Sequence, residues 1–227
     1  MNNNKILTLY SFVSPDAFVR LCQTILPLLP EVEALKVLNT RRRETALLSL
    51  AGKFLLKEGM HRLNLDISLL KQLHYNDHRR PIIGAAFDFN ISHSGNLVAC
   101  AVSQHTKIGL DIEKIKPYRD SHLHAFFNEE ERVLIAEAKD SLDTFYDLWT
   151  RKEAVLKADG RGLTLARKKL HFEGNLAIIE NDAQWEIHNL PINEEYAANL
   201  AIEPSYQSTF SLEEIKLDEE LAKLEHV

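Results

Sequence analysis

The chain has 227 residues, of which 45% are hydrophobic and 26% charged, a composition typical of a globular protein with one large core or two small ones. No apolar run approaches the roughly 20 residues that span a bilayer, and the apolar stretch near Met1 lacks the cleavage site of a signal peptide. The net charge of −6 gives no overall attraction to nucleic acid. The cysteines, Cys22 and Cys100, lack ligand-like spacing, so we expect packed thiols in a reduced, cytoplasmic protein.

Hydrophobic patterning predicts the first part of the chain as a strand followed by helices. Residues 5–13 alternate like a strand, and Ser14-Pro15-Asp16 opens a helix that Pro27 and Pro30 close. Apolar residues at helical spacing predict a long amphipathic helix from Thr40 to about Leu63. A short helix follows Asp66, and the polar stretch before Pro81 is expected to be a loop.

The middle and end of the chain read as strands, helices and strands again. Segments 89–92 and 97–103, with a turn at HSGN between them, lead into IGLDIE, and we expect these three strands to form one antiparallel unit. After Pro117 the pattern is helical and ends at Gly160 or Gly162. Strands follow between residues 168 and 210, and an acidic tail with spaced leucines begins at Ser211.

This order of elements predicts the α+β class, with two similar α/β halves that form a pseudo-dimer. Each half is expected to be a small, mostly antiparallel sheet packed with a long helix. We place the halves at residues 1–104 and 105–227, joined near residues 104–107.

Two acids lie one residue apart in the strand GLDIEK. Because side chains alternate along a strand, Leu110 and Ile112 point one way while Asp111 and Glu113 point the other. Burying both carboxylates unpaired would cost several kcal/mol. Solvent exposure, pairing with Lys or Arg, or a divalent cation would each resolve this, and hard oxygen ligands on a strand suit Mg²⁺.

A second cluster of charged residues lies on the predicted helix in WTRKEAVLKADGRGL. Trp149, Glu153 and Lys157 follow one another at intervals of four and share a helix face, with Lys152 one step round. A surface Glu–Lys pair would explain the spacing equally well. The apolar neighbours indicate a packed helix, which makes the Glu a candidate metal ligand and the lysines candidate phosphate ligands.

The third cluster is FNISHSG, where polar residues crowd the end of an apolar strand. Ser92 and His93 are sequence neighbours and the G-x-S-x-G motif is absent, so a phosphate or hydroxyl contact suits His93 better than the role of a catalytic base. A turn with capping hydroxyls is the alternative. Basic islands at 41–43, 79–80 and 114–119 are solvated surface or, in the sharper interpretation, contacts to a small polyanion.

Together and in this order, four strings resemble the 4′-phosphopantetheinyl transferases of the surfactin-synthetase-activating type. They are FNISHSG, GLDIEK, FFNEEE and WTRKEAVLKADGRGL, and their spacing is similar to the family's over residues 80–163. Such enzymes transfer the phosphopantetheine arm of coenzyme A to a serine of an acyl or peptidyl carrier protein and release adenosine 3′,5′-bisphosphate. The length is similar to that of the larger, monomeric branch, so the resemblance implies a monomer with no nucleic-acid or membrane partner.

For the reactive end of coenzyme A, the resemblance implies a metal site and two lysines. Asp111, Glu113 and Glu153 would hold Mg²⁺, with Mn²⁺ as the alternative, against the pyrophosphate. Glu153 is also the implied acceptor of the serine proton. Lys157 would contact the pyrophosphate and protonate the leaving phosphate, with Lys152 as a nearby donor.

For the adenosine end, the resemblance implies contacts from the N-terminal half. Ser92 and His93 match the family's phosphate contacts, and Arg80 before Pro81 would reach the adenosine. Where the family carries an Arg for the 3′-phosphate, this chain has Leu48 by our count from Gly52. We therefore expect the charge to come from Arg43, with Arg42 and Lys36 as alternatives.

Two other functions fit the same residues. One is a metal-dependent hydrolase that cleaves the coenzyme A pyrophosphate without a carrier protein. The other is a non-catalytic binder of coenzyme A or of a carrier protein. The sequence does not identify the carrier or its pathway.

Overall fold

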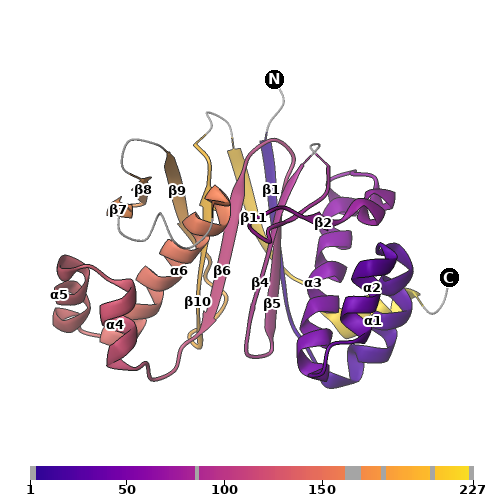
Figure 1. Cartoon of the computed structure of the whole chain (residues 1–227), viewed down its shortest axis with the longest axis horizontal. Helices are drawn as coiled ribbons and strands as arrows, with labels where there is room; N and C mark the ends of the chain where they lie inside the picture. Colours follow the sequence, from indigo (N-terminus) through magenta and orange to yellow (C-terminus); the bar gives the residue numbers. More distant parts are fainter. Residues whose placement is uncertain (1–3, 85–86, 162–169, 180–182, 205–207, 225–227) are drawn as a thin grey trace. The chain divides into compact units, whose positions relative to one another are not determined.

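The computed structural model describes residues 4–84, 87–161, 170–179, 183–204 and 208–224 (Figure 1). The chain divides into two compact units, unit 1 (Met1–Thr106 with Ser205–Val227) and unit 2 (Lys107–Pro204). Each unit has a small sheet and a long helix packed on it, so the expected α+β class is confirmed. The segment after Pro204, which the sequence interpretation placed with the C-terminal half, belongs to unit 1.

Unit 1 is built on a four-stranded sheet in the order β11-β1-β5-β4. β1 pairs antiparallel with β5 on one side and parallel with β11 on the other, and β4 pairs antiparallel with β5. Its N-terminal and C-terminal segments therefore share one sheet. The strands are β1 (Asn4–Phe12), β4 (Asp88–Ser94), β5 (Leu97–Ser103) and β11 (Ser208–Glu214).

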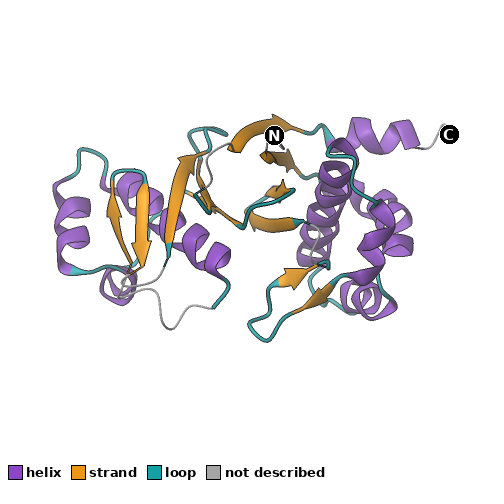
Figure 2. Cartoon of the chain, turned by 90° about the horizontal axis from the view of Figure 1, so that it is seen from above, coloured by secondary structure: helices purple, strands orange, loops and turns teal. Residues whose placement is uncertain are grey.

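The long helix α3 (Arg43–Arg62) packs on this sheet, and the helices of unit 1 gather on one face of it (Figure 2). α3 buries more of its surface than an amphipathic helix on a sheet needs, because α1 and α2 cover its other side. The smaller elements of unit 1 are η1 (Pro15–Ala17), α1 (Phe18–Ile25), η2 (Leu26–Leu28), α2 (Glu31–Leu38), η3 (Ile67–Gln72), β2 (His74–Tyr75), β3 (Pro81–Ile82) and α8 (Leu217–Leu224).

The hairpin of β4 and β5 corrects two details of the sequence analysis. β4 continues through His93 to Ser94, and the turn is only Gly95-Asn96, with Gly95 at φ 58° as the first position of a type II′ turn requires. The strand of GLDIEK does not extend this hairpin. It pairs with β10 in the other sheet, because the connection at 104–107 carries the chain into unit 2.

Unit 2 is an antiparallel five-stranded sheet in the order β6-β10-β9-β8-β7, covered by α6 on β6 and β10. Its strands are β6 (Ile108–Lys114), β7 (Leu170–Glu173), β8 (Leu176–Ile179), β9 (Gln184–Asn189) and β10 (Tyr196–Ile202). Its helices are α4 (Asp120–Phe126), α5 (Glu129–Glu137) and α6 (Ser141–Asp159).

Both ends of α6 are capped by residues suited to the position. The Asp140 carboxylate accepts hydrogen bonds from the backbone N–H groups of Leu142 and Asp143, which have no partner inside the helix. Gly160 ends the helix at φ 75°, as expected for a left-handed C-cap. The alternative end, Gly162, lies outside the described residues.

A glycine brings α6 close to β6. A Cβ built on Gly109 would lie 2.0 Å from the carbonyl oxygen of Ala154 and 2.3 Å from the backbone nitrogen of Ala158. Both neighbours are main-chain atoms of the helix, so they cannot move aside as a side chain does. The strand and helix therefore touch backbone to backbone at this residue.

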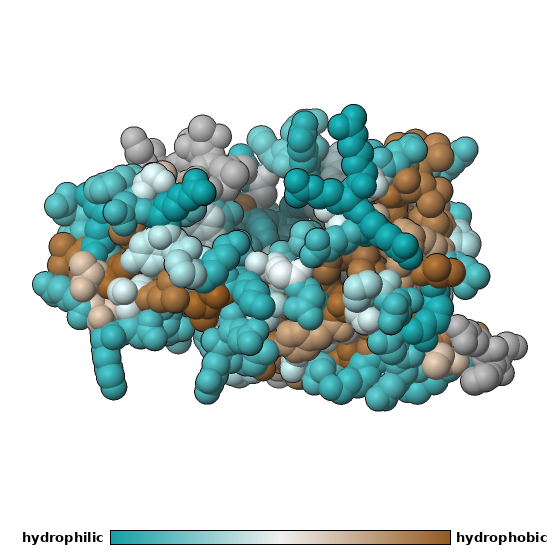
Figure 3. All heavy atoms as spheres, turned by 90° about the horizontal axis from the view of Figure 1, so that it is seen from below, coloured by the Kyte–Doolittle hydropathy of each residue, from teal (hydrophilic) through white to brown (hydrophobic). Residues whose placement is uncertain are grey.

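The apolar residues form cores inside each unit. Hydrophilic side chains dominate the face drawn in Figure 3, where the apolar ones form separate patches. Within the described ranges, no helix has the length and apolar character needed to cross a membrane.

We expect Gly109→Ala to lower the free energy of unfolding by about 1–3 kcal/mol, because the new methyl group forces apart two backbones. Urea denaturation followed by tryptophan fluorescence measures this, since both tryptophans, Trp149 and Trp185, lie in unit 2.

Gly52→Ala is the matched control, read by circular dichroism. Its methyl group would meet the Ile91 Cγ2 atom at 2.6 Å, a side-chain group that can shift, and alanine favours the helix by about 1 kcal/mol. An equal loss of stability in the two variants would contradict the special role of Gly109.

Candidate functional site

In unit 2, the strand β6 presents its two acids to the helix α6. Gly109, Asp111 and Glu113 alternate with Leu110 and Ile112, so they share the strand face that α6 covers. Leu110 and Ile112 are buried as expected, and Asp111 is only 4% exposed while Glu113 is half-buried. The strand thus carries one buried and one partly solvated carboxylate on the same side.

The lysine in the last turn of α6 reaches this strand. Lys157 Nζ donates to Asp111 Oδ1 at 2.7 Å and to the Leu110 carbonyl oxygen at 3.0 Å. The Lys157 side chain is 31% exposed, whereas that of Asp111 is 6% exposed. Motifs 46 residues apart in the sequence therefore meet through an ion pair with one open side.

Glu153 lies one helical turn before Lys157 and is half-buried. Trp149, one turn earlier, packs on Phe126 with ring centroids 4.3 Å apart and on Phe145 at 6.3 Å. The face predicted from the spacing of Trp149, Glu153 and Lys157 thus runs from an aromatic cluster to the carboxylates of β6.

The donor chemistry of Asp111, Glu113 and Glu153 suits Mg²⁺, which takes one or two protein carboxylates and completes its coordination with water and phosphate oxygens. In the part of the chain that the structure describes, no three His, Cys, Asp or Glu side chains are close enough together to hold a metal ion. The Asp111 carboxylate is instead paired with Lys157.

The second lysine of the motif is enclosed. Lys152 Nζ donates to Glu131 Oε2 at 2.5 Å and to the Phe126 carbonyl oxygen at 3.2 Å, and lies 5.1 Å from the centroid of the Phe127 ring. The side chains of Lys152 and Glu131 are 5% and 10% exposed. Glu131 also closes a capping box with Asn128 at the start of α5. This pair ties α5 to α6.

In unit 1, His93 and Ser92 point to opposite sides of β4. His93 faces α3 and lines a pocket of about 170 Å³, whose polar lining also includes Ser49, Lys53 and Tyr75. Ser92 is buried on the other face of the sheet. His93 therefore lines this pocket, and Ser92 does not.

Lys53 is the cation of this pocket. It is 7% exposed, and its Nζ donates to Ser49 Oγ at 2.9 Å. Burial lowers the pKa of Lys53, and the nearby Glu33 carboxylate opposes that shift. Tyr75 donates its hydroxyl to Glu33 Oε2 at 3.0 Å, and burial together with that carboxylate raises the pKa of Tyr75 to about 12.

The two arginines predicted for the adenosine end lie elsewhere in unit 1. Arg80 donates to both carboxylate oxygens of Asp88, at 2.8 and 2.6 Å. Arg43 stacks over the Phe18 ring at 4.7 Å and lines a second pocket of about 420 Å³ together with Leu48 and the Gly95-Asn96 turn. Arg43 and His93 thus belong to different pockets.

Comparison with known proteins finds a family that part of the chain resembles. A model described as the 4′-phosphopantetheinyl transferase superfamily matches residues 107–215, which include β6 and α6. A little under half of the chain is therefore similar to the 4′-phosphopantetheinyl transferase superfamily.

Similar curated proteins carry the same description. The 4′-phosphopantetheinyl transferase Sfp of Bacillus subtilis is 43% identical over 96 residues, which are 40% of this chain and 42% of Sfp. The transferase gsp of Aneurinibacillus migulanus is 39% identical over 90 residues, 39% of this chain and 38% of gsp. AcpT of Salmonella typhimurium is 35% identical over 118 residues, 49% of this chain and 57% of AcpT. The chain thus spans about two fifths of the length of the first two relatives and over half of AcpT.

Sequence reasoning did not find Lys53. The signal was present, because Lys53 follows Ala46 and Leu50 at helical spacing and so occupies a position on the apolar face of α3. A lysine at such a position must be paired or must face a polar cavity. Leu48, the residue in place of the expected arginine, is buried and apolar.

We expect Glu131→Gln to lower the free energy of unfolding by about 3–5 kcal/mol, because it leaves the Lys152 ammonium buried without a counter-charge. Glutamine can still cap α5, so the variant isolates the charge. Denaturant unfolding measures the change.

The control is Glu129→Gln, which removes an exposed partner of Arg132 and should change stability by no more than about 0.5 kcal/mol. If Glu131→Gln loses no more stability than Glu129→Gln, the buried ion pair makes no special contribution to the free energy of unfolding.

Proposed function

We propose that this protein transfers the 4′-phosphopantetheine arm of coenzyme A to a serine of an acyl or peptidyl carrier protein. The observation that carries the proposal is the contact of Lys157 with Asp111, which joins two of the four motifs inside the segment that matches the superfamily. Adenosine 3′,5′-bisphosphate is the expected second product. The compartment is the reduced cytoplasm, in keeping with the free thiols Cys22 and Cys100.

Asp111, Glu113 and Glu153 are the proposed ligands of Mg²⁺. Bound there, the ion would offset the charge of the pyrophosphate and of the leaving group. Asp111 must then exchange its ammonium partner for the metal, which frees Lys157 for a phosphate oxygen. The partial exposure of Lys157 allows this exchange, because its ammonium can turn without becoming desolvated.

The chemical step is an in-line displacement at the phosphorus that carries the pantetheine arm. The serine oxygen forms the new bond to this phosphorus, and the bond from the phosphorus to the bridging pyrophosphate oxygen breaks. Glu153 accepts the serine proton, and Lys157 donates a proton to the leaving phosphate. Lys152 remains paired with Glu131 and supports this helix face, since leaving the pair would strand a buried carboxylate.

The adenosine end of coenzyme A is assigned to unit 1. Lys53, Ser49 and His93 line one pocket and offer an ammonium, a hydroxyl and an imidazole, which are donors for a phosphate monoester. Arg80 and Arg43 remain candidates for the adenosine and outer phosphate contacts. Lys53 supplies the positive charge for the 3′-phosphate, which the apolar Leu48 cannot provide.

Incubation of the protein with coenzyme A, Mg²⁺ and an apo carrier protein should add one phosphopantetheine mass to the carrier, as read by intact-protein mass spectrometry. Asp111→Asn and Glu153→Gln should lower the rate by at least about 100-fold, because each removes a carboxylate from the charge-stabilising site.

A panel of acyl and peptidyl carriers tests the partner, with a known transferase as the positive control. No mass gain on any carrier would reject the proposal. Release of bisphosphate without a carrier would indicate a hydrolase instead.

We expect Lys53→Met to raise the KM for coenzyme A about 10- to 100-fold and to leave the KM for dephospho-coenzyme A unchanged, since a charge-assisted hydrogen bond contributes about 1.5–3 kcal/mol. Because burial lowers the pKa of Lys53, the wild-type KM should begin to rise at a pH below that expected for an ordinary lysine.

Lys57→Met, one turn along α3 and paired with Glu58, serves as the control and should change neither KM. Equal KM changes for the two substrates in Lys53→Met would remove Lys53 from the 3′-phosphate site.

A further inference from the structure

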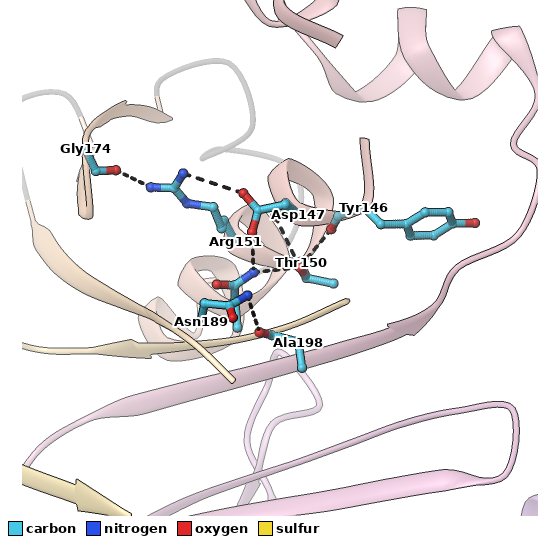
Figure 4. A network of polar contacts seen from close by, with 8 residues as sticks. Tyr146, Asp147, Thr150, Arg151, Gly174, Asn189 and Ala198 are labelled. Carbon is cyan, nitrogen blue, oxygen red and sulfur yellow. Dashed lines mark hydrogen bonds and ion pairs between the residues drawn. The ribbon is translucent and has the colours of Figure 1, made fainter. Parts of the chain in front are cut away.

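Thr150, in the WTRKEA motif, is fully buried and forms a contact that the proposed chemistry does not use. Its hydroxyl donates to the Tyr146 carbonyl oxygen at 2.8 Å and accepts a hydrogen bond from Asn199 Nδ2 at 2.9 Å (Figure 4). Asn199 lies on β10 and is 1% exposed. A side-chain hydrogen bond therefore fastens the middle of α6 to the sheet.

The amide of Asn199 uses both of its N–H groups on α6. Besides Thr150, it donates to Asp147 Oδ1 at 3.1 Å. A primary amide is the neutral side chain with two N–H donors on one nitrogen, so it can hold a hydroxyl and a carboxylate of adjacent helical turns together. These two hydrogen bonds thus restrain α6 from sliding along its axis and from rotating about it.

The network continues from Asp147 to the far end of the sheet. The Asp147 carboxylate lies 3.8 Å from a guanidinium nitrogen of Arg151, and Arg151 donates to the carbonyl oxygen of Gly174, in the turn between β7 and β8 (Figure 4). The guanidinium also lies over the Phe172 ring at 4.6 Å. The helix is therefore attached to both β10 and the β7–β8 hairpin.

Asn199 lies directly opposite Asp111 in the register of β10 and β6. Side chains opposite one another in an antiparallel pair point to the same face, so both face α6. Among its polar attachments to the sheet, α6 thus has one on each of these neighbouring strands, Thr150 to Asn199 and Lys157 to Asp111. The two attached helix residues are seven positions apart, which is about 10 Å along the axis.

The proposed function requires one of these attachments to open, because Lys157 must leave Asp111 to serve the pyrophosphate. We propose that Asn199 is a positioning residue that, through Thr150 and Asp147, keeps α6 in register on the sheet when Lys157 leaves Asp111. Glu153, three residues after Thr150, then stays in place relative to β6. The expected effect on catalysis rests on the proposed function, whereas the expected effect on the packing of α6 does not.

The kinetic test compares three substitutions on α6. Thr150→Val removes the hydroxyl at nearly constant volume and should lower kcat about 10- to 100-fold with little change in the KM for coenzyme A, since small displacements of catalytic groups have effects of this size. Thr150→Ser keeps the hydroxyl and should restore kcat to within about twofold of the wild type.

Thr144→Val is the matched control. Thr144 makes the same hydroxyl bond to a carbonyl four residues earlier, that of Asp140, but it is half-buried and this bond is open to solvent. It should leave kcat unchanged. A kcat of Thr150→Val within twofold of the wild type, measured where both proteins are folded, would overturn the proposal.

Hydrogen exchange tests the same inference without any activity. In Lys157→Met, amides 150–158 should keep at least half of their wild-type protection, because the Asn199 contact remains. In the double variant Thr150→Val/Lys157→Met, protection should fall at least tenfold. Equal protection in these two variants would overturn the inference even if transfer is observed. If the wild type shows no transfer while these exchange results hold, the proposed function fails and the attachment of α6 stands.

Discussion

The close approach of α6 to β6 at Gly109 is the constraint on which the candidate site depends. With no side chain at this residue, the backbone at Ala154 and Ala158 rests against the strand. Glu153 and Lys157 immediately precede these alanines, and Asp111 follows Gly109 by two residues on the same strand face. The charged groups of two distant segments therefore meet because main chains touch.

Burial assigns different roles to the two lysines of α6. The pair of Lys152 and Glu131 is enclosed on both sides, so opening it would leave a bare charge in a medium of low dielectric constant. The pair of Lys157 and Asp111 has one open side, where water can solvate a displaced ammonium. A lysine that must change partners during a reaction can be only the second kind. Both lysines belong to the same sequence motif. Their difference in burial comes from the aromatic and α5 contacts around Lys152.

Local sequence patterns predicted much of the secondary structure. They did not predict which strands pair with one another. The limits of α3, to within three residues, and the end of α6 at Gly160 were predictable because they depend on neighbours in the chain. The partner of β6 was predicted wrongly, since a strand buried on both faces carries no signal for which edge it joins. In the site, the spacing of Glu153 and Lys157 gave a common face, but the enclosure of Lys152 depends on α5, a separate element.

A glycine lies where the long helix meets the sheet in each unit, but its neighbours differ. In unit 1 the glycine is on the helix, where Gly52 meets Ile91 of β4, and in unit 2 it is on the strand. In each case a lysine lies beside the contact, Lys53 next to Gly52 and Lys157 next to Ala158. Such a lysine runs its alkyl chain along the buried contact and presents only its ammonium at the end. In unit 2 the position of the ammonium therefore depends on how closely the two backbones approach, whereas in unit 1 the glycine meets a side chain that can shift. An arginine, longer and planar, would not place its charge at the same point, so the close approach at Gly109 is matched to a lysine at position 157.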